Sequence, residues 1–262
     1  MRYKRWGAAA LAFCLLLLSA CSGSPAQPET TEPEEPDSPV VSIQPEEEPT
    51  AAPQPTGTPE PTATPHVFDP SLLEDMPDKD EYLRLRGVNG DVVGWITVPN
   101  TVINYPVVLG EDNDYYLKHT PEREASKSGS IFFDYRNSRE ADDRHIILYG
   151  HNMRNGSMFH DLPNYYRIRE FFDNSREITL WVGDEKRVYE VYASFIATED
   201  IYFIRTKFKS DETFLSYMQE LQSLAKYPTD TVLTAQDQIL TLCTCTYEET
   251  NARGVVQARR IR

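Results

Sequence analysis

Two cysteines near the C-terminus have the clearest chemical potential in this chain. Cys243 and Cys245 lie in the run DQILTLCTC, whose Ile, Leu and Thr residues are typical of a β-strand. In an extended strand both thiols lie on one face, while Leu240, Leu242 and Thr244 lie on the other, which we expect to face the core. The two Cα atoms would be roughly 7 Å apart, at the edge of disulfide geometry. A functional thiol is therefore a better interpretation than a structural bridge.

Arg253 can supply the positive charge that a reacting thiol and its substrate need. After Cys245 the short loop TYEETNA leads into a second strand-like run, which opens at Arg253. If the two runs pair as an antiparallel hairpin, Arg253 returns close to Cys245. Alone, a cysteine is more often a small buried hydrophobe, and an arginine a surface charge. Their placement at the two ends of one loop favours a shared site.

A nucleophilic thiol also needs a partner that accepts its proton. Five histidines are available: His66, His119, His145, His151 and His160. His151 follows the buried-looking strand HIILYG and begins the polar turn HNMRNGS. A glycine before it and a polar turn after it would place an exposed imidazole at a strand end. His151 is therefore the candidate acid/base residue.

The N-terminus predicts export from the cytoplasm. Residues 1–20 join a basic start, MRYKRW, to an apolar run of about fourteen residues, which suits a signal peptide. A membrane span needs about twenty apolar residues. The run ends in LSAC, which resembles the lipobox of bacterial lipoproteins, with Cys21 as the lipidation site. An uncleaved signal anchor is the alternative; either way we expect the protein at the extracellular face of the membrane.

Residues 21–66 are expected to form a disordered spacer before a catalytic domain at 67–262. The spacer holds twelve of the nineteen prolines and nine acidic residues, so it cannot bury enough apolar surface to fold. The net charge of −15, without a basic stripe, excludes nucleic-acid binding as a function. No residues have metal-ligand spacing, so we expect neither a metal nor another cofactor.

The domain is expected to be mainly β with α decoration. Helical segments are predicted at 70–87, 112–118, 157–172 and 211–225, with Asp69 or Ser71 as a cap of the first. Short strands with a few helices are typical of a single β-barrel or sandwich. The candidate strands are VVGWITV, VINYPVVL, SIFFDY, HIILYG, ITLWVG, VYEVYASFIA, QILTLCTC and GVVQARRI.

These motifs together resemble the class B sortases. TLCTC is similar to the TLxTC signature of sortases, whose last residue is the catalytic cysteine, and Arg253 stands where class B members carry an arginine. Similarity extends to VVGWITVPNTVINYPVVLGEDNDYYLKHT, GSIFFDYRN and YGHNMRNGSMFHDL, and covers residues 85–262. The resemblance implies a single sortase-type eight-stranded β-barrel with N-terminal helices.

The resemblance also implies an activity, that of a cysteine transpeptidase on Gram-positive cell surfaces. Cys245 would attack the Thr carbonyl of a C-terminal sorting signal and form a thioester. His151 would move the proton, and Arg253 would stabilise the oxyanion or bind substrate carbonyls. An amine of a peptidoglycan precursor or a pilin would then accept the surface protein. The expected partners are therefore surface proteins, this acceptor and, through the N-terminal lipid, the membrane.

Seven further residues match positions that line the peptide groove in class B sortases: Asn113, Leu117, Tyr149, Thr198, Tyr202, Phe203 and Cys243. Ordinary packing is the alternative role for Leu117 and Phe203. Cys243 departs from the family pattern, which often has a small hydroxyl residue there. Tyr247, two residues after Cys245, does not support a triad containing Asp. The lipobox and long spacer also differ from the usual N-terminal membrane anchor.

Two other functions remain open from the sequence. The same three residues could serve a lipid-tethered cysteine peptidase that mainly hydrolyses its substrates. An inactive lipoprotein could instead bind surface peptides through the same groove. The reactivity of Cys245 towards thiol reagents distinguishes the second function from an enzyme.

Overall fold

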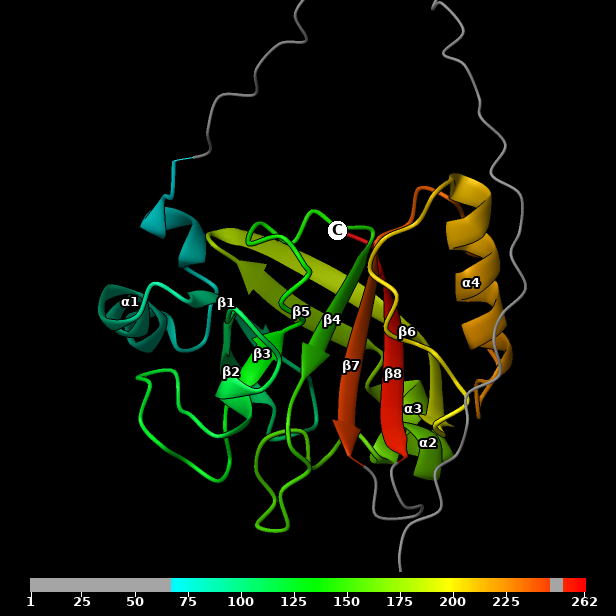
Figure 1. The fold of residues 1–262 in the computed structure, drawn as a ribbon, viewed down its shortest axis with the longest axis horizontal. Coiled ribbons are helices and arrows are strands. Elements are labelled where there is room, and N and C mark those ends of the chain that lie inside the picture. Colours follow the sequence, from blue (N-terminus) through cyan, green and yellow to red (C-terminus); the bar gives the residue numbers. More distant parts are fainter. Residues whose placement is uncertain (1–66, 246–251) are drawn as a thin grey trace, which may run out of the picture. The chain divides into compact units, whose positions relative to one another are not determined.

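The computed structural model describes residues 67–245 and 252–262, and of Cys245 the backbone alone. Its strands close into a barrel in the order β1-β2-β3-β4-β7-β8-β6-β5 (Figure 1), which confirms the predicted architecture. The predicted signal peptide, Cys21, the spacer 21–66 and Tyr247 lie outside the described residues. The strands are β1 Val92–Thr97, β2 Asn104–Val108, β3 Ile131–Phe133, β4 His145–Tyr149, β5 Glu177–Val182, β6 Glu185–Ala197, β7 Ile239–Cys245 and β8 Arg253–Arg260.

The pairing of the strands is mixed. β2 with β3 and β4 with β7 are parallel, and the other neighbours in the barrel are antiparallel. Each run predicted as a strand from its β-branched and aromatic residues overlaps one of these strands, although β5, β6 and β8 begin before their predicted runs. The parallel pair β4–β7 matters most for function, because both strands end at the same edge of the barrel.

Strand β6 changes its buried face halfway along. Tyr189 and Val191 point into the barrel core, but Phe195 and Ala197 belong to a cluster outside it. The register with β8 shifts between Val191 and Ala193, which marks an irregularity of the β-bulge type. One extra residue reverses the faces that the following side chains occupy. The end of β6 can therefore pack under an outer helix.

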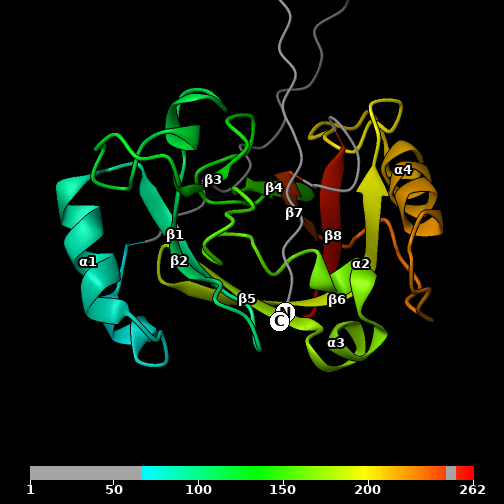
Figure 2. The ribbon, with the colours of Figure 1, turned by 90° about the horizontal axis from the view of Figure 1, so that it is seen from below.

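Helices cover two opposite sides of the barrel, as Figure 2 shows for α1 and α4. One apolar cluster fills the barrel, a second lies against α1 and a third lies beneath α4. Asp69 caps the first turn by accepting a hydrogen bond from Ser71 N at 2.9 Å, as expected. The helical segments are η1 Pro70–Leu73, α1 Lys79–Val88, η2 Tyr115–Leu117, α2 Asn164–Arg167, α3 Arg169–Asn174 and α4 Asp211–Ser223.

The predicted single helix at 157–172 is wrong, because two short helices form instead, beginning only at Asn164 and ending at Asn174. Met158 has a φ of 60°, which a right-handed helix cannot include. Ile168, with φ −125° and ψ 107°, separates α2 from α3 in an extended conformation. Of the helical segment predicted at 112–118, only the 3₁₀ turn η2 forms.

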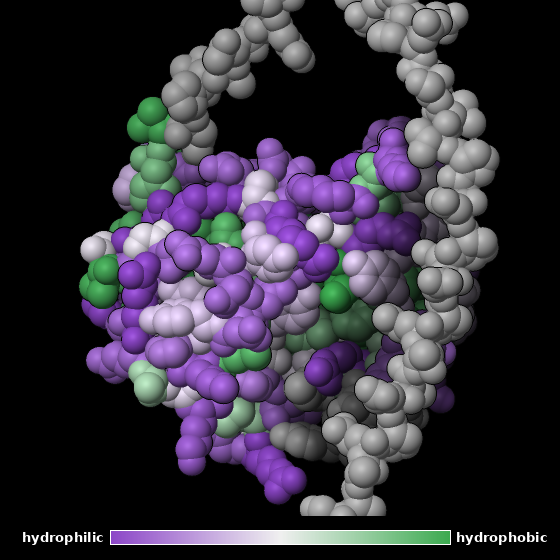
Figure 3. Space-filling view, viewed as in Figure 1, coloured by the Kyte–Doolittle hydropathy of each residue, from purple (hydrophilic) through white to green (hydrophobic). Residues whose placement is uncertain are grey.

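One face of the described surface is mostly polar (Figure 3). On the face drawn in Figure 3, hydrophilic residues predominate and the apolar ones form small separate areas. Within residues 67–245 and 252–262, we find no helix with the length and apolar character that crossing a membrane requires.

A chain of hydrogen bonds fixes His145 in its neutral form on the outer side of β4. Its Nδ1 donates to the carbonyl of Arg205 at 2.7 Å, because a carbonyl can only accept. Its Nε2 then accepts from the hydroxyl of Thr241 at 2.7 Å, and that hydroxyl accepts from Gln257 Nε2 at 3.3 Å. Complete burial, despite the bond to the Arg205 carbonyl, lowers the pKa of His145 to about 4.

His145 should make the folded state less stable in mild acid. Between pH 6.5 and about 4 the unfolded chain binds a proton at this residue that the folded chain excludes. The free energy of unfolding therefore decreases as the pH is lowered through this range. The full effect is about 3 kcal/mol. Denaturant unfolding across this range should show a flatter pH dependence for His145→Gln. His160→Gln, at an exposed position, is the control and should keep the wild-type slope.

Candidate active site

Four neighbouring strands bring the predicted catalytic residues to one edge of the barrel. In the register, Tyr149 of β4 lies opposite Cys243 of β7, and Cys245 lies opposite Arg253 of β8. Arg253 also pairs with Ala197, the last residue of β6. The hairpin expected from the sequence is present, and the backbones of Cys245 and Arg253 are direct neighbours. The parallel β4 ends beside them and leads into His151.

The imidazole of His151 has a defined orientation. Its Nε2 lies 2.8 Å from the carbonyl of Leu117, which can only accept, so Nε2 carries a proton in this arrangement. The loop that holds it closes when Phe159 N donates to the His151 carbonyl at 2.9 Å. In the neutral ring Nδ1 is therefore the basic nitrogen, available for proton transfer. The Leu117 carbonyl is a contribution that the sequence did not reveal.

Gly150 leaves no room for a side chain next to His151. A Cβ at this position would lie 2.4 Å from Ile131 Cδ1 and 2.9 Å from Phe159 Cγ. The glycine backbone also donates to the carbonyl of Cys243 at 3.2 Å, which joins the His151 loop to β7. Close packing of the barrel core therefore sets the exit direction of the chain from β4.

Gly150→Ala should destabilise the protein by about 1–3 kcal/mol and displace His151, because the crowded Cβ must push the chain or Phe159 away. Denaturant unfolding and the turnover rate would measure the two effects. Gly87→Ala is the control, since Gly87 lies in α1 with nothing within 4 Å of an added Cβ. Unchanged stability in Gly150→Ala would show that the site tolerates repacking.

Two of the predicted peptide-contact residues, Asn113 and Tyr149, meet at the buried carboxylate of Asp134. Tyr149 Oη donates to Asp134 Oδ2 at 2.9 Å, and Asn113 Nδ2 donates to the same oxygen at 3.2 Å. Asn113 Oδ1 also accepts from the backbone of Tyr135 at 3.0 Å. Burial and the negative charge of Asp134 raise the pKa of Tyr149, so its hydroxyl stays protonated and donates at neutral pH.

The other predicted contact residues differ widely in exposure. Thr198 follows β6 and donates to Asp200 Oδ1, while Tyr202 is 54% exposed. Phe203 is 8% exposed and Cys243 only 3%, and both belong to the cluster beneath α4. Cys243 therefore packs as a small buried side chain in this structure. A substrate contact of either buried residue stays a prediction.

Asp134 and Arg136 are the residues near this edge that the sequence did not single out. They lie in GSIFFDYRN, where an acid directly after a strand is typical of a turn. The structure shows instead that the Asp134 side chain is completely buried and bound by Arg136 Nε and Nη2, both at 2.7 Å. An acid and an arginine two residues apart after a buried strand were the available signal.

Comparisons with known proteins agree with this geometry. Residues 96–261 match the family described as the sortase domain. Sortase B of Listeria monocytogenes is 37% identical over 185 residues, which are 70% of this chain and 75% of the relative. The crystal structure of Clostridium perfringens sortase B has a TM-score of 0.65 and 39% identity, covering 69% of this chain and 99% of that one. A Staphylococcus aureus sortase B–substrate complex has a TM-score of 0.66 and 32% identity, covering 73% and 90%.

A closed eight-stranded barrel with cysteine, histidine and arginine at adjoining strand ends defines a cysteine transpeptidase of the sortase type. The chain belongs to the sortase family, and the relatives described above are sortases of class B.

Proposed function

We propose that this transpeptidase cleaves a C-terminal sorting signal after Thr and joins the released surface protein to an amine. The acceptor is an amine of a peptidoglycan precursor or of a pilin. The observation that carries the proposal is the strand register, in which Cys245 lies opposite Arg253 while the adjoining β4 leads into His151. Three groups with complementary chemistry thus share one edge of the barrel.

The first half of the reaction forms an acyl-enzyme. The thiolate of Cys245 attacks the Thr carbonyl carbon, and the carbonyl electron pair moves to the oxygen. Arg253, always charged and rich in fixed donors, stabilises this oxyanion. His151, protonated at Nδ1, gives that proton to the leaving amine as the C–N bond breaks. The Leu117 carbonyl keeps the ring oriented, because Nε2 stays bonded to it throughout.

The second half reverses these roles. The incoming amine attacks the thioester, and His151 Nδ1 accepts the proton that this nucleophile loses. The tetrahedral intermediate then expels the Cys245 thiolate, and a new amide bond forms. If water replaces the amine, the same steps give hydrolysis. The acceptor alone therefore separates a transpeptidase from a peptidase.

Mass spectrometry of the protein with a panel of sorting-signal peptides tests the proposal. Each peptide is offered with and without an amine, beside the Cys245→Ala variant. We expect a thioester adduct on Cys245, and cleavage after Thr that becomes ligation when the amine is present. Cleavage without any ligation would point to a peptidase. No adduct with any peptide, from a folded protein whose Cys245 also resists alkylation, would overturn the proposed activity.

A further inference from the structure

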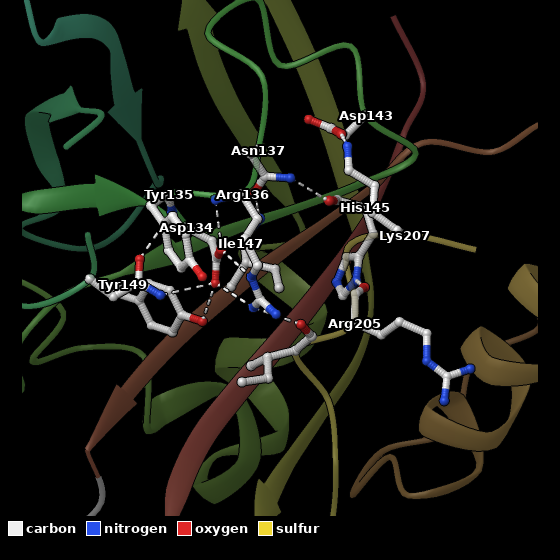
Figure 4. A network of polar contacts seen from close by, with 12 residues as sticks. Asp134, Tyr135, Arg136, Asn137, Asp143, His145, Ile147, Tyr149, Arg205 and Lys207 are labelled. Carbon is white, nitrogen blue, oxygen red and sulfur yellow. Dashed lines mark hydrogen bonds and ion pairs between the residues drawn. The ribbon is translucent and has the colours of Figure 1, made fainter. Parts of the chain in front are cut away.

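One buried carboxylate lies beneath the residues predicted to contact the peptide. Asp134 directly follows β3, and its carboxylate accepts bonds from the Arg136 side chain, from Arg136 N at 3.0 Å, from Tyr149 and from Asn113. Figure 4 shows the carboxylate of Asp134 facing Arg136 and Tyr149. The two last donors come from separate parts of the chain, the turn before η2 and the end of β4.

Arg136 extends this group of contacts to a third segment, the connection between β6 and α4. Its Nη2 donates to the carbonyl of Ile204 at 2.9 Å while it remains paired with Asp134. Tyr202, two residues before Ile204, interacts with the Arg136 side chain and helps to raise the pKa of that guanidinium. A single ion pair thus holds Asn113, Tyr149 and the segment containing Tyr202.

The charges of this pair are stable at neutral pH. Burial alone would raise the pKa of Asp134, but the hydrogen bonds from Arg136 and Tyr149 hold it below its ordinary value. Asp134 in turn raises the pKa of Arg136. The carboxylate therefore stays an acceptor for all its donors. Geometry that depends on two complementary charges is fixed more narrowly than geometry set by apolar packing.

We propose that the Asp134–Arg136 pair is a positioning element that sets the arrangement of Asn113, Tyr149 and Tyr202 for peptide binding. The inference rests on the proposed function, because those three residues are the predicted peptide contacts. The pair does not touch the reacting atoms. Its effect falls on the affinity for the peptide, and the intrinsic reactivity of Cys245 does not depend on it.

A buried ion pair could instead serve stability alone, so the test needs an acid and an arginine with the same spacing elsewhere, here with an acid that is 46% exposed. Glu185 and Arg187 provide it at the opposite end of β6. Arg187 follows its acid by two residues, donates to Glu185 through Nε at 2.9 Å and Nη2 at 2.6 Å, and reaches the distant carbonyl of Glu140 at 2.8 Å. These bonds go to residues outside the predicted site, so Arg187→Lys reports on stability alone.

The experiment compares Arg136→Lys with Arg187→Lys in the full chain. Lysine keeps the charge but cannot hold a carboxylate through two donors while it also reaches the Ile204 carbonyl. We expect Arg136→Lys to lower kcat/KM for the sorting peptide by about 10- to 100-fold, mainly through KM. Alkylation of Cys245 by a small thiol reagent, located by peptide mapping, should stay within about twofold. The two lysine variants should show similar melting temperatures.

Asp134→Asn provides a second variant with the same expected direction. In the double variant Asp134→Asn/Arg136→Lys, the loss of kcat/KM should be no greater than in the worse single variant, because each change already breaks the same ion pair. If Arg136→Lys loses no more kcat/KM than Arg187→Lys, the inference about the ion pair is overturned, while the proposed function stands. A parallel fall in Cys245 alkylation, which indicates general damage, would overturn the inference too. A folded wild type inactive on every peptide would overturn the proposed function and this inference with it.

Discussion

Cys245→Ala is expected to abolish turnover, by about 10⁴-fold or more, whereas Cys243→Ser should keep most of it. Cys245 ends β7 opposite Arg253, where a thiolate and a guanidinium can act on one carbonyl. Cys243 lies two residues earlier and is 3% exposed among apolar side chains. Because the other thiol at this edge among the described residues, that of Cys243, is buried, loss of the Cys245 sulfur should leave no acyl-enzyme.

The Cys243→Ser variant is the matched control for that experiment. A serine hydroxyl at this buried position should cost about 1–3 kcal/mol of stability, because it replaces a weakly polar thiol in an apolar cluster. Peptide cleavage and intact-mass detection of the thioester would be measured for both variants, together with denaturant unfolding. An inactive Cys243→Ser and an active Cys245→Ala would reverse the assignment of the nucleophile.

The strands were predictable because local chemistry specifies them. Runs such as HIILYG and VYEVYASFIA combine β-branched and aromatic residues between turn signals; they contain β4 and most of β6. The order of the strands around the barrel was not predictable from the residues, because the parallel contact of β4 with β7 joins segments about ninety positions apart. The closed barrel was expected only from the resemblance to sortases.

The same contrast between local sequence and long-range contacts explains which parts of the site could be predicted. Cys245 and Arg253 flank one loop of seven residues, so a hairpin could be inferred from the sequence. The strand register confirms it. The neighbour of His151 is the carbonyl of Leu117, a backbone group that no side-chain pattern reports. Asp134 and Arg136 resemble an ordinary polar turn until the fold buries the acid. Long-range contacts, rather than residue types, give both of these groups their roles.

Arg253→Lys should lower kcat by about 10²–10³-fold, which is the effect of removing an oxyanion donor. Arg253 opens β8, pairs with both Cys245 and Ala197, and donates through Nη1 to the carbonyl of Ala252 at 3.1 Å. Those backbone pairings fix its Cα relative to the nucleophile. Lysine preserves the positive charge but offers one flexible ammonium in place of a planar set of donors. Steady-state kinetics with a sorting peptide would separate kcat from KM.

Arg259→Lys is the control for this prediction, since Arg259 lies on the same strand at the opposite end and bonds to the carbonyl of Val232. It should keep wild-type kinetics. A fall in kcat for Arg253→Lys, with KM unchanged, would mean that the guanidinium acts where charge develops in the transition state. A rise in KM alone would contradict the oxyanion role and assign Arg253 to the peptide carbonyls in the bound substrate. Because the register fixes Cys245 against Arg253 in either case, the kinetic pattern decides between stabilising the transition state and binding the substrate.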